Sequence, residues 1–340
     1  MKRKSSSVKK LNNNLLQDKK ILNLYLKLNE VLINNKIDKS FAVAVSGGPD
    51  SMALAGLSSI LAVQKNYNVF FILVDHGIRK NSSSEAKKVK KLLQKNNIQL
   101  NVLKNKTVIT KNIQKNAREV RYELLSKFCK KNKLKYLLTA HHQDDQIETF
   151  FIRLSRGSGV EGLSSMSEKT NIKYGTKLIR PFLDLEKEKL KYIAKKLFGK
   201  TFKDPSNKNK KFLRTNIRNL KKILEEKGLN TERIADSIKN IALTKDAINF
   251  YVSRSIKKFV KFKKTETILN LLDFRKEPKE IKFRIINSIL KKRAQTYYPP
   301  RSYKVVNLIN RFENNKVKKC TLGGCILEKR KNLLYVSREL

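Results

Sequence analysis

The stretch Ser46-Gly47-Gly48-Pro49-Asp50-Ser51 follows the apolar run at 41–45 and precedes the apolar run that starts at Met52. This order predicts a strand, a tight loop of small residues and a helix. The glycines and serines let a phosphate approach the backbone, and the N–H groups at the start of the helix attract anions. Asp50 adds a carboxylate, which suits a phosphate if a divalent cation lies between them. The stretch predicts a nucleotide-phosphate site, with a plain tight turn as the alternative.

Strand and helix patterns alternate around this loop. Apolar strands separated by helices predict an α/β fold with a parallel sheet covered on both faces. Ligands bind beyond the carboxyl ends of such strands, where the loops 46–51, 75–79 and 141–145 should meet. The expected strands are 41–45, 69–75, 98–103, 136–140 and 177–182, and the expected helices are 21–33, 51–64, 84–96, 113–131, 145–154 and 185–197.

The pattern changes after the glycine-rich segment 156–162. A basic helix is expected at 212–227 and more helix at 231–262, and two apolar runs at 321–327 and 332–337 suggest a hairpin. We expect a basic flexible arm at 1–20, a catalytic nucleotide-binding domain at 21–227, and a smaller, mainly helical domain at 228–340 that ends in the hairpin.

The charge of the chain indicates a polyanionic partner. Its 340 residues carry a formal net charge of +48, which attracts nucleic acid first and an anionic membrane second. The alternative is a lysine-rich genome that coats solvated faces with Lys.

The three cysteines, Cys129, Cys320 and Cys325, form no Cys-x-x-Cys pair. This argues for a reducing, cytoplasmic location and against a disulfide framework or a cysteine-held metal. No apolar run approaches the roughly 20 residues that a membrane span needs. We therefore expect no membrane partner.

Polar residues follow the strand at 69–75. Asp75, His76 and Arg79 surround Gly77 and are expected to face the ligand edge of the sheet. A polar loop without a ligand is the alternative.

The helix expected at 113–131 carries Arg118, Arg121 and Tyr122 within about one turn. Two neighbouring guanidinium groups make a phosphate clamp. Ion pairing with Glu119 or Glu123 would be the structural alternative and would contribute little to stability.

A run of acidic residues follows the strand at 136–140. In the sequence His141-His142-Gln143-Asp144-Asp145, and with Glu148 one turn later, three carboxylates lie close together. Such like charges repel one another unless a cation holds them, so a metal-held nucleotide or a cationic substrate would explain them. Capping of the helix start is the alternative. His141 and His142 could also suggest a zinc site. Adjacent side chains at the end of a strand point in opposite directions, however, so a zinc site that uses both histidines is disfavoured.

These motifs resemble those of known families. The loop at 46–51 is similar to the SGGxDS loop of the PP-loop ATP pyrophosphatases and lacks the Gly-Lys-Ser/Thr ending of the Walker loop. In order along the chain, SGGPDS, VDHGIR, NIQKNAREVRYELL, AHHQDDQIETFFIRLSRGSGVEGL, LIRPFLDLEKEKL and DPSNKNKKFLRTNIRN resemble the motifs of the tRNA(Ile)-lysidine synthetases. The C-terminal YPPR and TLGGCIL segments resemble that family less specifically.

The resemblance implies a PP-loop fold and a two-step reaction. ATP adenylates the oxygen at carbon 2 of the wobble cytidine in the CAU anticodon of tRNA(Ile), and the amine of free L-lysine then displaces AMP to give lysidine. The implied enzyme is an AMP-forming ligase that uses ATP and magnesium.

The resemblance also implies roles for individual residues. Asp145 matches the essential aspartate of the HxxxD motif and would bind magnesium, together with Asp50, or the ammonium group of lysine. Asp144 and Glu148 would assist Asp145, and His141 would orient the phosphate or the base. ATP would contact Ser46, Gly47, Gly48, Pro49, Asp50, Ser51, Asp75 and His76. The residues expected to contact tRNA or phosphate are Arg79, Arg118, Arg121, Arg153, Arg156, Arg214 and Arg218. The domain at 228–340 is expected to bind tRNA as well.

Other functions remain as alternatives. The nearest is another adenylating PP-loop enzyme that modifies tRNA, although 2-thiolation needs the paired cysteines that this chain lacks. A synthetase that acts on small molecules is disfavoured by the excess positive charge of the chain and by its arginine-rich helix at 212–227. A nucleic-acid-binding protein with a degenerate site would not need the concentrated negative charge of Asp50 and Asp145.

Overall fold

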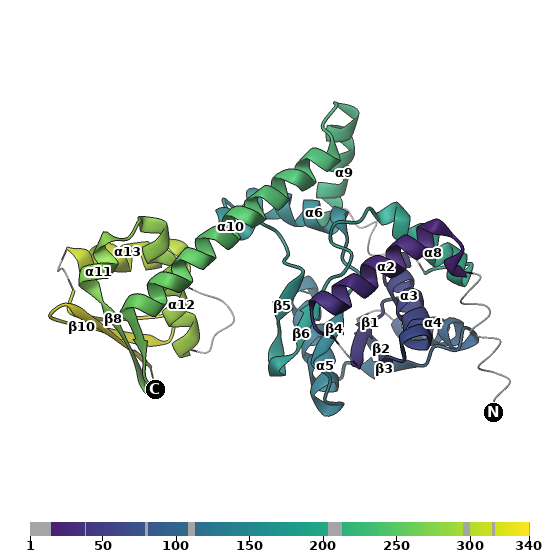
Figure 1. The fold of residues 1–340 in the computed structure, drawn as a ribbon, viewed down its shortest axis with the longest axis horizontal. Helices are drawn as coiled ribbons and strands as arrows, with labels where there is room; N and C mark the ends of the chain where they lie inside the picture. Colours follow the sequence, from purple (N-terminus) through teal and green to yellow (C-terminus); the bar gives the residue numbers. More distant parts are fainter. Residues whose placement is uncertain are drawn as a thin grey trace. The chain divides into compact units, whose positions relative to one another are not determined.

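The fold was analysed in a computed structural model that describes residues 15–37, 39–78, 81–107, 113–202, 213–294, 300–314 and 317–339. The chain divides into two compact units, Met1–Asn240 and Ile241–Leu340. Figure 1 traces the elements of both units along the chain. Arg79 and the basic loop at 203–211 lie outside the described residues.

The first unit contains the predicted α/β sheet. Its six strands lie in the order β3-β2-β1-β4-β6-β5, and every neighbouring pair is parallel except β5 and β6. The chain therefore steps outward from β1 in both directions, to β2 on one side and to β4 on the other. The strands are β1 (Ser40–Ala44), β2 (Asn68–Asp75), β3 (Leu100–Lys104), β4 (Tyr136–Leu138), β5 (Lys169–Asn171) and β6 (Lys177–Ile179).

Helices cover both faces of this sheet. Successive residues of a strand point to opposite faces, and those of β1 are apolar on both, so each face needs a covering layer. Phe41 and Val43 of β1 pack into a core shared with α2, α3, α4 and α8, whereas Ala42 packs on the other face, against Leu125 and Cys129 of α5. The helices of this unit are α2 (Lys19–Asn34), α3 (Pro49–Lys65), α4 (Ser82–Lys95), α5 (Ile113–Lys131), α6 (Gln143–Leu154), α7 (Val160–Leu163), α8 (Lys187–Phe198) and α9 (Leu213–Glu226), with a short 3₁₀ turn at Lys173–Gly175.

Two features of this unit differ from the sequence-based expectation. The antiparallel edge strand β5 was not expected, since its three polar residues carry no strand pattern. The ordered fold also begins before residue 21. Asp18 caps α2 by accepting a hydrogen bond from the backbone N of Lys20 at 2.9 Å, and Leu15 and Leu16 pack against the core.

The second unit pairs helices with a five-stranded antiparallel sheet of order β7-β8-β11-β10-β9. Its core joins α11, α12 and α13 to the inner face of that sheet. The elements are α10 (Thr231–Phe259), which begins in the first unit, β7 (Val260–Phe262), β8 (Glu266–Asn270), α11 (Leu271–Lys276), α12 (Lys279–Ala294), α13 (Ser302–Glu313), β9 (Lys319–Leu322), β10 (Cys325–Arg330) and β11 (Leu333–Arg338).

The expected hairpin is part of this larger sheet. Gly323 and Gly324 adopt positive φ angles of 62° and 75° and turn the chain between β9 and β10, so the run at 321–327 is two strands rather than one. The hairpin partner of β10 is β11. The expected helix at 231–262 ends at Phe259, where β7 begins.

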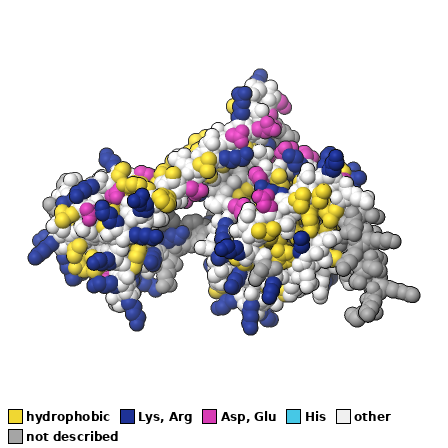
Figure 2. All heavy atoms as spheres, viewed as in Figure 1, with side chains coloured by type: hydrophobic (Ala, Val, Ile, Leu, Met, Phe, Trp, Pro, Cys, Tyr) yellow, Lys and Arg dark blue, Asp and Glu magenta, His cyan; other side chains and the backbone are white. Residues whose placement is uncertain are grey.

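The domain limits and the domain roles expected from the sequence stay predictions. Figure 2 shows Lys and Arg side chains spread over the visible face of each unit. Among the described residues, no helix is long and apolar enough to cross a membrane.

Candidate active site

The loop between β1 and α3 is held by its own serines. The backbone N of Ser46 donates to Ser51 Oγ at 3.0 Å, and Ser51 Oγ donates to the carbonyl of Gly48 at 3.0 Å. The two serine hydroxyls also lie 3.0 Å apart. These bonds fix the loop conformation without a ligand, so its backbone is preorganised.

Gly47 is required at its position. Its φ angle is +84°, and a Cβ there would lie 2.6 Å from Cγ2 of Val89. Its carbonyl also accepts a hydrogen bond from the backbone N of Phe202 at 3.0 Å. The glycine therefore permits both a left-handed backbone and close packing under the loop.

The start of α3 is an open anion site. Gly48 is the N-cap and forms no side-chain cap, and Pro49 occupies the first turn. The uncapped N–H groups of a 17-residue helix, with the positive end of its dipole, face away from the helix at this edge. This is the arrangement that helices use to bind phosphates.

Asp50 and Asp145 come together at one histidine. The Nε2 atom of His142 lies 3.6 Å from Asp50 Oδ2 and 3.5 Å from Asp145 Oδ2. Asp145 Oδ2 also accepts a hydrogen bond from the backbone N of His142 at 3.1 Å, which is the capping role considered above. The site thus joins the loop after β1 to the loop after β4, where the order of the sheet reverses.

The charges around His142 determine its protonation. Burial alone lowers the pKa of this side chain, but Asp50 and Asp145 outweigh burial and raise the pKa above its usual value. The imidazole between the two carboxylates therefore keeps its proton to a higher pH than an ordinary histidine would, and it contacts both of them.

The two carboxylates fit a magnesium ion. Oδ1 of Asp50 is buried and has no hydrogen-bond partner, so it can accept a cation. Within the described residues, no cluster of three or more His, Cys, Asp or Glu side chains could hold a metal ion alone. Mg²⁺ does not need such a cluster, because it binds through one or two carboxylates together with substrate phosphates and water.

His141 marks a basic side of the site. Its Nδ1 lies 2.9 Å from Thr139 Oγ1. Burial, followed by the charges of Arg180, Arg118 and Arg214, holds the pKa of His141 well below its usual value. The ring is therefore neutral at pH 7, and Arg118 and Arg214 are exposed near it.

The other two acidic residues of α6 face α9 instead. Glu148, whose side chain is 4% exposed, accepts hydrogen bonds from Nε and Nη2 of Arg218. Asp144 Oδ1 lies 2.7 Å from Nζ of Lys221, and this lysine keeps the pKa of Asp144 below its usual range despite partial burial. The expected cluster of three carboxylates is thus divided. Asp145 lies on the side of Asp50, whereas Asp144 and Glu148 form ion pairs with the basic helix α9.

The loop after β2 is also braced internally. Asp75 accepts hydrogen bonds from the backbone N of Gly77 at 3.1 Å and from Ser83 Oγ at 2.6 Å. His76 Nε2 accepts from Nε of Arg121 at 3.3 Å. Burial and then the charge of Arg121 lower the pKa of His76 to about 4. In this structure Asp75 therefore shapes the loop, and Arg121 engages His76.

The two arginines of the glycine-rich segment differ. Nη1 of Arg153 donates to the carbonyls of Gly162 and Ser165 at 2.7 and 2.8 Å, so this side chain braces the segment. Arg156 is exposed. Of these two, Arg156 is the more exposed to solvent.

Sequence reasoning missed two of these features. It did not single out His142, because its neighbour His141 occupies the family motif. It also did not foresee the ion pairs between α6 and α9. The only sequence signal for them is the opposite charge of Glu148 and Asp144 against Arg218 and Lys221, 70 and 77 positions apart.

Comparisons with known proteins extend this picture. A family model described as a PP-loop domain matches residues 21–226. The chain is 36% identical over 323 residues to a tRNA(Ile)-lysidine synthase of Wolbachia pipientis wMel, covering 91% of this chain and 74% of the relative. It is 34% identical over 321 residues to the enzyme of the same name from Rickettsia typhi, covering 91% and 73%.

A solved structure shows the same fold. The U34-tRNA thiolase NcsA from Methanococcus maripaludis, determined with its [4Fe-4S] cluster, superposes with a TM-score of 0.55 at 19% identity and covers 65% of this chain and 79% of that one. At that identity the likeness supports the PP-loop fold alone.

Proposed function

The chain belongs to the tRNA(Ile)-lysidine synthase family, and from this premise we propose how its residues divide the reaction. It is an ATP-dependent ligase of the PP-loop class that acts on tRNA(Ile). The finer points of the proposal are lysine as the second substrate, magnesium as the cofactor, the CAU anticodon as the target and a cytoplasmic location. We further propose a role for each site residue.

The first step of the proposal forms an adenylate. The oxygen on carbon 2 of the wobble cytidine attacks the α-phosphorus of ATP, and the bond to pyrophosphate breaks. Ser46 to Ser51 and the open start of α3 receive the phosphates through backbone N–H groups, which stabilise the charge that develops. Asp50 and Asp145 would hold magnesium, which supplies charge neutralisation on the phosphates when it is bound.

The second step replaces oxygen with nitrogen. The amine of lysine attacks carbon 2, the carbon–oxygen bond breaks, and AMP leaves with the oxygen while the amine loses a proton. His142 keeps Asp50 and Asp145 oriented throughout. The neutral His141, with the exposed Arg118 and Arg214, lines the side where the base and its phosphates would lie.

The proposal revises two expectations. Arg218 and Lys221 anchor α9 on α6, so their first role is to position the helix. Arg214, one turn earlier and exposed, is the better candidate for a tRNA phosphate contact. Asp144 and Glu148 act as the partners of this anchor rather than as metal ligands.

One observation carries the proposal most directly. Asp50 and Asp145 approach the same imidazole nitrogen beside an uncapped helix start, at the point where the sheet order reverses. Only the loops after β1 and β4 could bring them there. The arrangement supports phosphate activation by a carboxylate-held cation.

The phosphate products of ATP test this assignment. The protein is incubated with L-lysine and ATP labelled at the α-phosphate, with and without unmodified tRNA(Ile) transcript. We expect tRNA-dependent AMP and pyrophosphate, because the loop lacks the Walker lysine and resembles pyrophosphatase loops. ADP as the tRNA-dependent product would contradict the proposal.

The alternative PP-loop chemistry is 2-thiolation, which needs paired cysteines to carry sulfur or a cluster. Cys129 is buried in α5, and burial raises the pKa of its thiol to about 12. Cys320 and Cys325 belong to the second unit, on neighbouring strands. Incubation with a sulfur donor instead of lysine separates the two reactions, and we expect no thiolated nucleoside.

A further inference from the structure

The second unit contains a pocket lined mainly by cationic side chains. Its volume is about 360 Å³, and the described residues that line it are Arg275, Val317, Lys318, Lys329, Lys331 and Asn332. Four of the six carry a positive charge, and none carries a negative charge. The pocket belongs wholly to this unit, so its geometry does not depend on how the two units are placed.

Three separate segments build the pocket, and backbone hydrogen bonds fix them to one another. The backbone N of Lys329, in β10, donates to the carbonyl of Lys318 at 2.7 Å. The backbone N of Leu271, which begins α11, donates to the carbonyl of Asn332 at 2.8 Å. Because α11 carries Arg275, the cations are held on a rigid frame rather than on a free loop.

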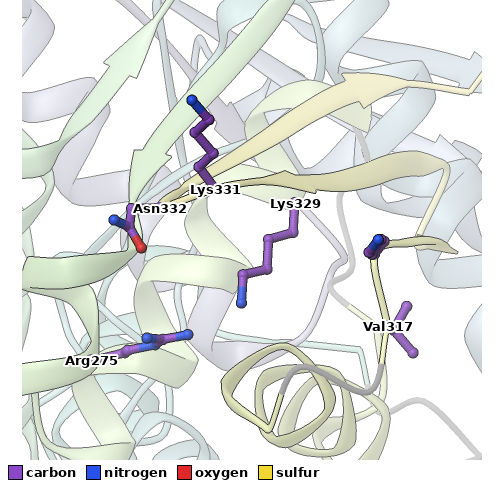
Figure 3. A pocket seen from close by; sticks show the side chains of 6 residues that line it. Arg275, Val317, Lys329, Lys331 and Asn332 are labelled. Atoms are coloured by element: carbon purple, nitrogen blue, oxygen red, sulfur yellow. The ribbon is translucent and has the colours of Figure 1, made fainter.

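Two of the cationic side chains converge on the hollow, whereas Lys331 points away from it (Figure 3). Figure 3 shows the side chains of Arg275 and Lys329 pointing toward the same space, with Asn332 beside them. The Lys329 ammonium also lies 3.4 Å from the carbonyl of Phe312. Burial and then the nearby charge of Arg275 lower the pKa of Lys329, so the two groups repel each other.

The neighbouring acidic side chains are engaged elsewhere. Glu328 pairs with Arg330 at 2.8 Å, and Asp273 lies 3.8 Å from the Lys276 ammonium. Among the described residues, none of Arg275, Lys318 and Lys331 forms an ion pair with a carboxylate. Positive charges that converge on one space are stabilised when an anion enters between them. A guanidinium, ammonium groups and an amide together are the donors that suit a phosphate group.

We propose that this pocket binds a phosphate group, and that the phosphate comes from the backbone of the tRNA substrate. The identification of tRNA as the source of the phosphate rests on the proposed function, whereas the ability of the pocket to bind a phosphate group does not. The pocket is an open hollow on the second unit, and the +48 charge of the chain favours a polyanion over a small anion. A free phosphate compound would offer the same chemistry, so the experiment separates the two sources.

The test compares a pocket variant with a matched control in the full chain. The pocket variant is Arg275→Gln with Lys329→Gln, the two side chains that face the same space (Figure 3). The control is Lys279→Gln with Lys304→Gln, which removes the same charge from exposed positions of the same unit that do not line the pocket. Circular dichroism and thermal unfolding confirm that both variants keep the fold.

The first arm measures the affinity for tRNA(Ile) transcript across a salt series. Loss of one phosphate contact should lower the slope of log affinity against log salt by ~0.7–0.9 in the pocket variant only. The second arm measures calorimetric binding of inorganic phosphate in chloride buffer. A change in the tRNA arm supports the proposal with RNA as the source.

The remaining outcomes count against the proposal in part or in whole. A change in the phosphate arm alone confirms a phosphate pocket but overturns tRNA as its source. Equal behaviour of pocket variant and control in both arms overturns the pocket itself. Lysine incorporation is measured separately in the wild type, so a failure of the proposed function is distinguishable from a failure of the pocket.

Discussion

Replacing Arg218 and Glu148 in turn should destabilise the chain unequally. The Glu148 side chain is only 4% exposed, whereas that of Arg218 is 32% exposed. Breaking a fully buried pair by removing one partner costs about 3–5 kcal/mol, because the remaining charge is stranded. Arg218→Gln strands the more buried carboxylate, so we expect a loss of about 2–3 kcal/mol, somewhat below that range. Glu148→Gln leaves a guanidinium that can reach water and bond the new amide, so we expect a loss of about 1–2 kcal/mol.

Urea unfolding of the two single variants and the double variant gives these losses and their coupling. Hydrogen exchange of the α9 amides shows whether the helix detaches locally, which a global transition alone would miss. We expect faster exchange in α9 with Arg218→Gln than with Glu148→Gln, and a coupling energy above about 1 kcal/mol. Equal losses, or no coupling, would refute the reasoning that the buried carboxylate anchors α9.

Four further predictions follow from the site. Asp50→Asn and Asp145→Asn should each lower the single-turnover rate of AMP formation by ~10²–10³ with the fold intact, and a near-wild-type rate would remove that residue from the site. Gly47→Ala should lower the free energy of unfolding, measured by thermal unfolding, by about 1–3 kcal/mol and weaken ATP binding, because its φ is +84° and its new Cβ would lie 2.6 Å from Val89. Gly48→Ala is the control and should keep the fold, since its new Cβ meets only Ser46 Oγ at 3.7 Å. The pKa of His76 is lowered from 6.5 to about 4, so the unfolded chain binds the proton first and stability falls as pH drops from 6.5 to 4; urea midpoints of His76→Gln should fall less over that window than those of the wild type. Arg214→Gln should lower the salt slope of tRNA binding by ~0.7–0.9, and an unchanged slope would place it outside the interface.

Local patterns in the sequence predicted most of the strands and helices of the first unit. The run at 41–45 alternates between two buried faces, and the small residues after it can only turn, so strand, loop and helix followed directly. Asp50 and Asp145 could be placed at one edge because both follow parallel strands. Each strand and helix could be predicted from the spacing of apolar residues within its own segment. The shared edge of the sheet could be predicted from the alternation of strands and helices along the chain.

Long-range partners could not be predicted in the same way. Asp144, Asp145 and Glu148 look alike in the sequence, and only the fold shows that Asp145 faces His142 while the other two face α9. The edge strand β5 is polar and short, and its pairing with β6 is the only feature that makes it a strand. Gly323 and Gly324 looked like part of one apolar run, although their positive φ angles divide it.

Transfer of lysine to the wobble position tests the central claim most directly. The protein is incubated with ATP, isotope-labelled L-lysine and unmodified tRNA(Ile) transcript with the CAU anticodon, and the nucleosides are then separated and weighed by mass spectrometry. The account predicts one labelled lysidine per tRNA, with AMP formed in equal amount and no product on a transcript whose wobble cytidine is replaced. ATP turnover and tRNA binding without labelled nucleoside, in a folded protein, would contradict it.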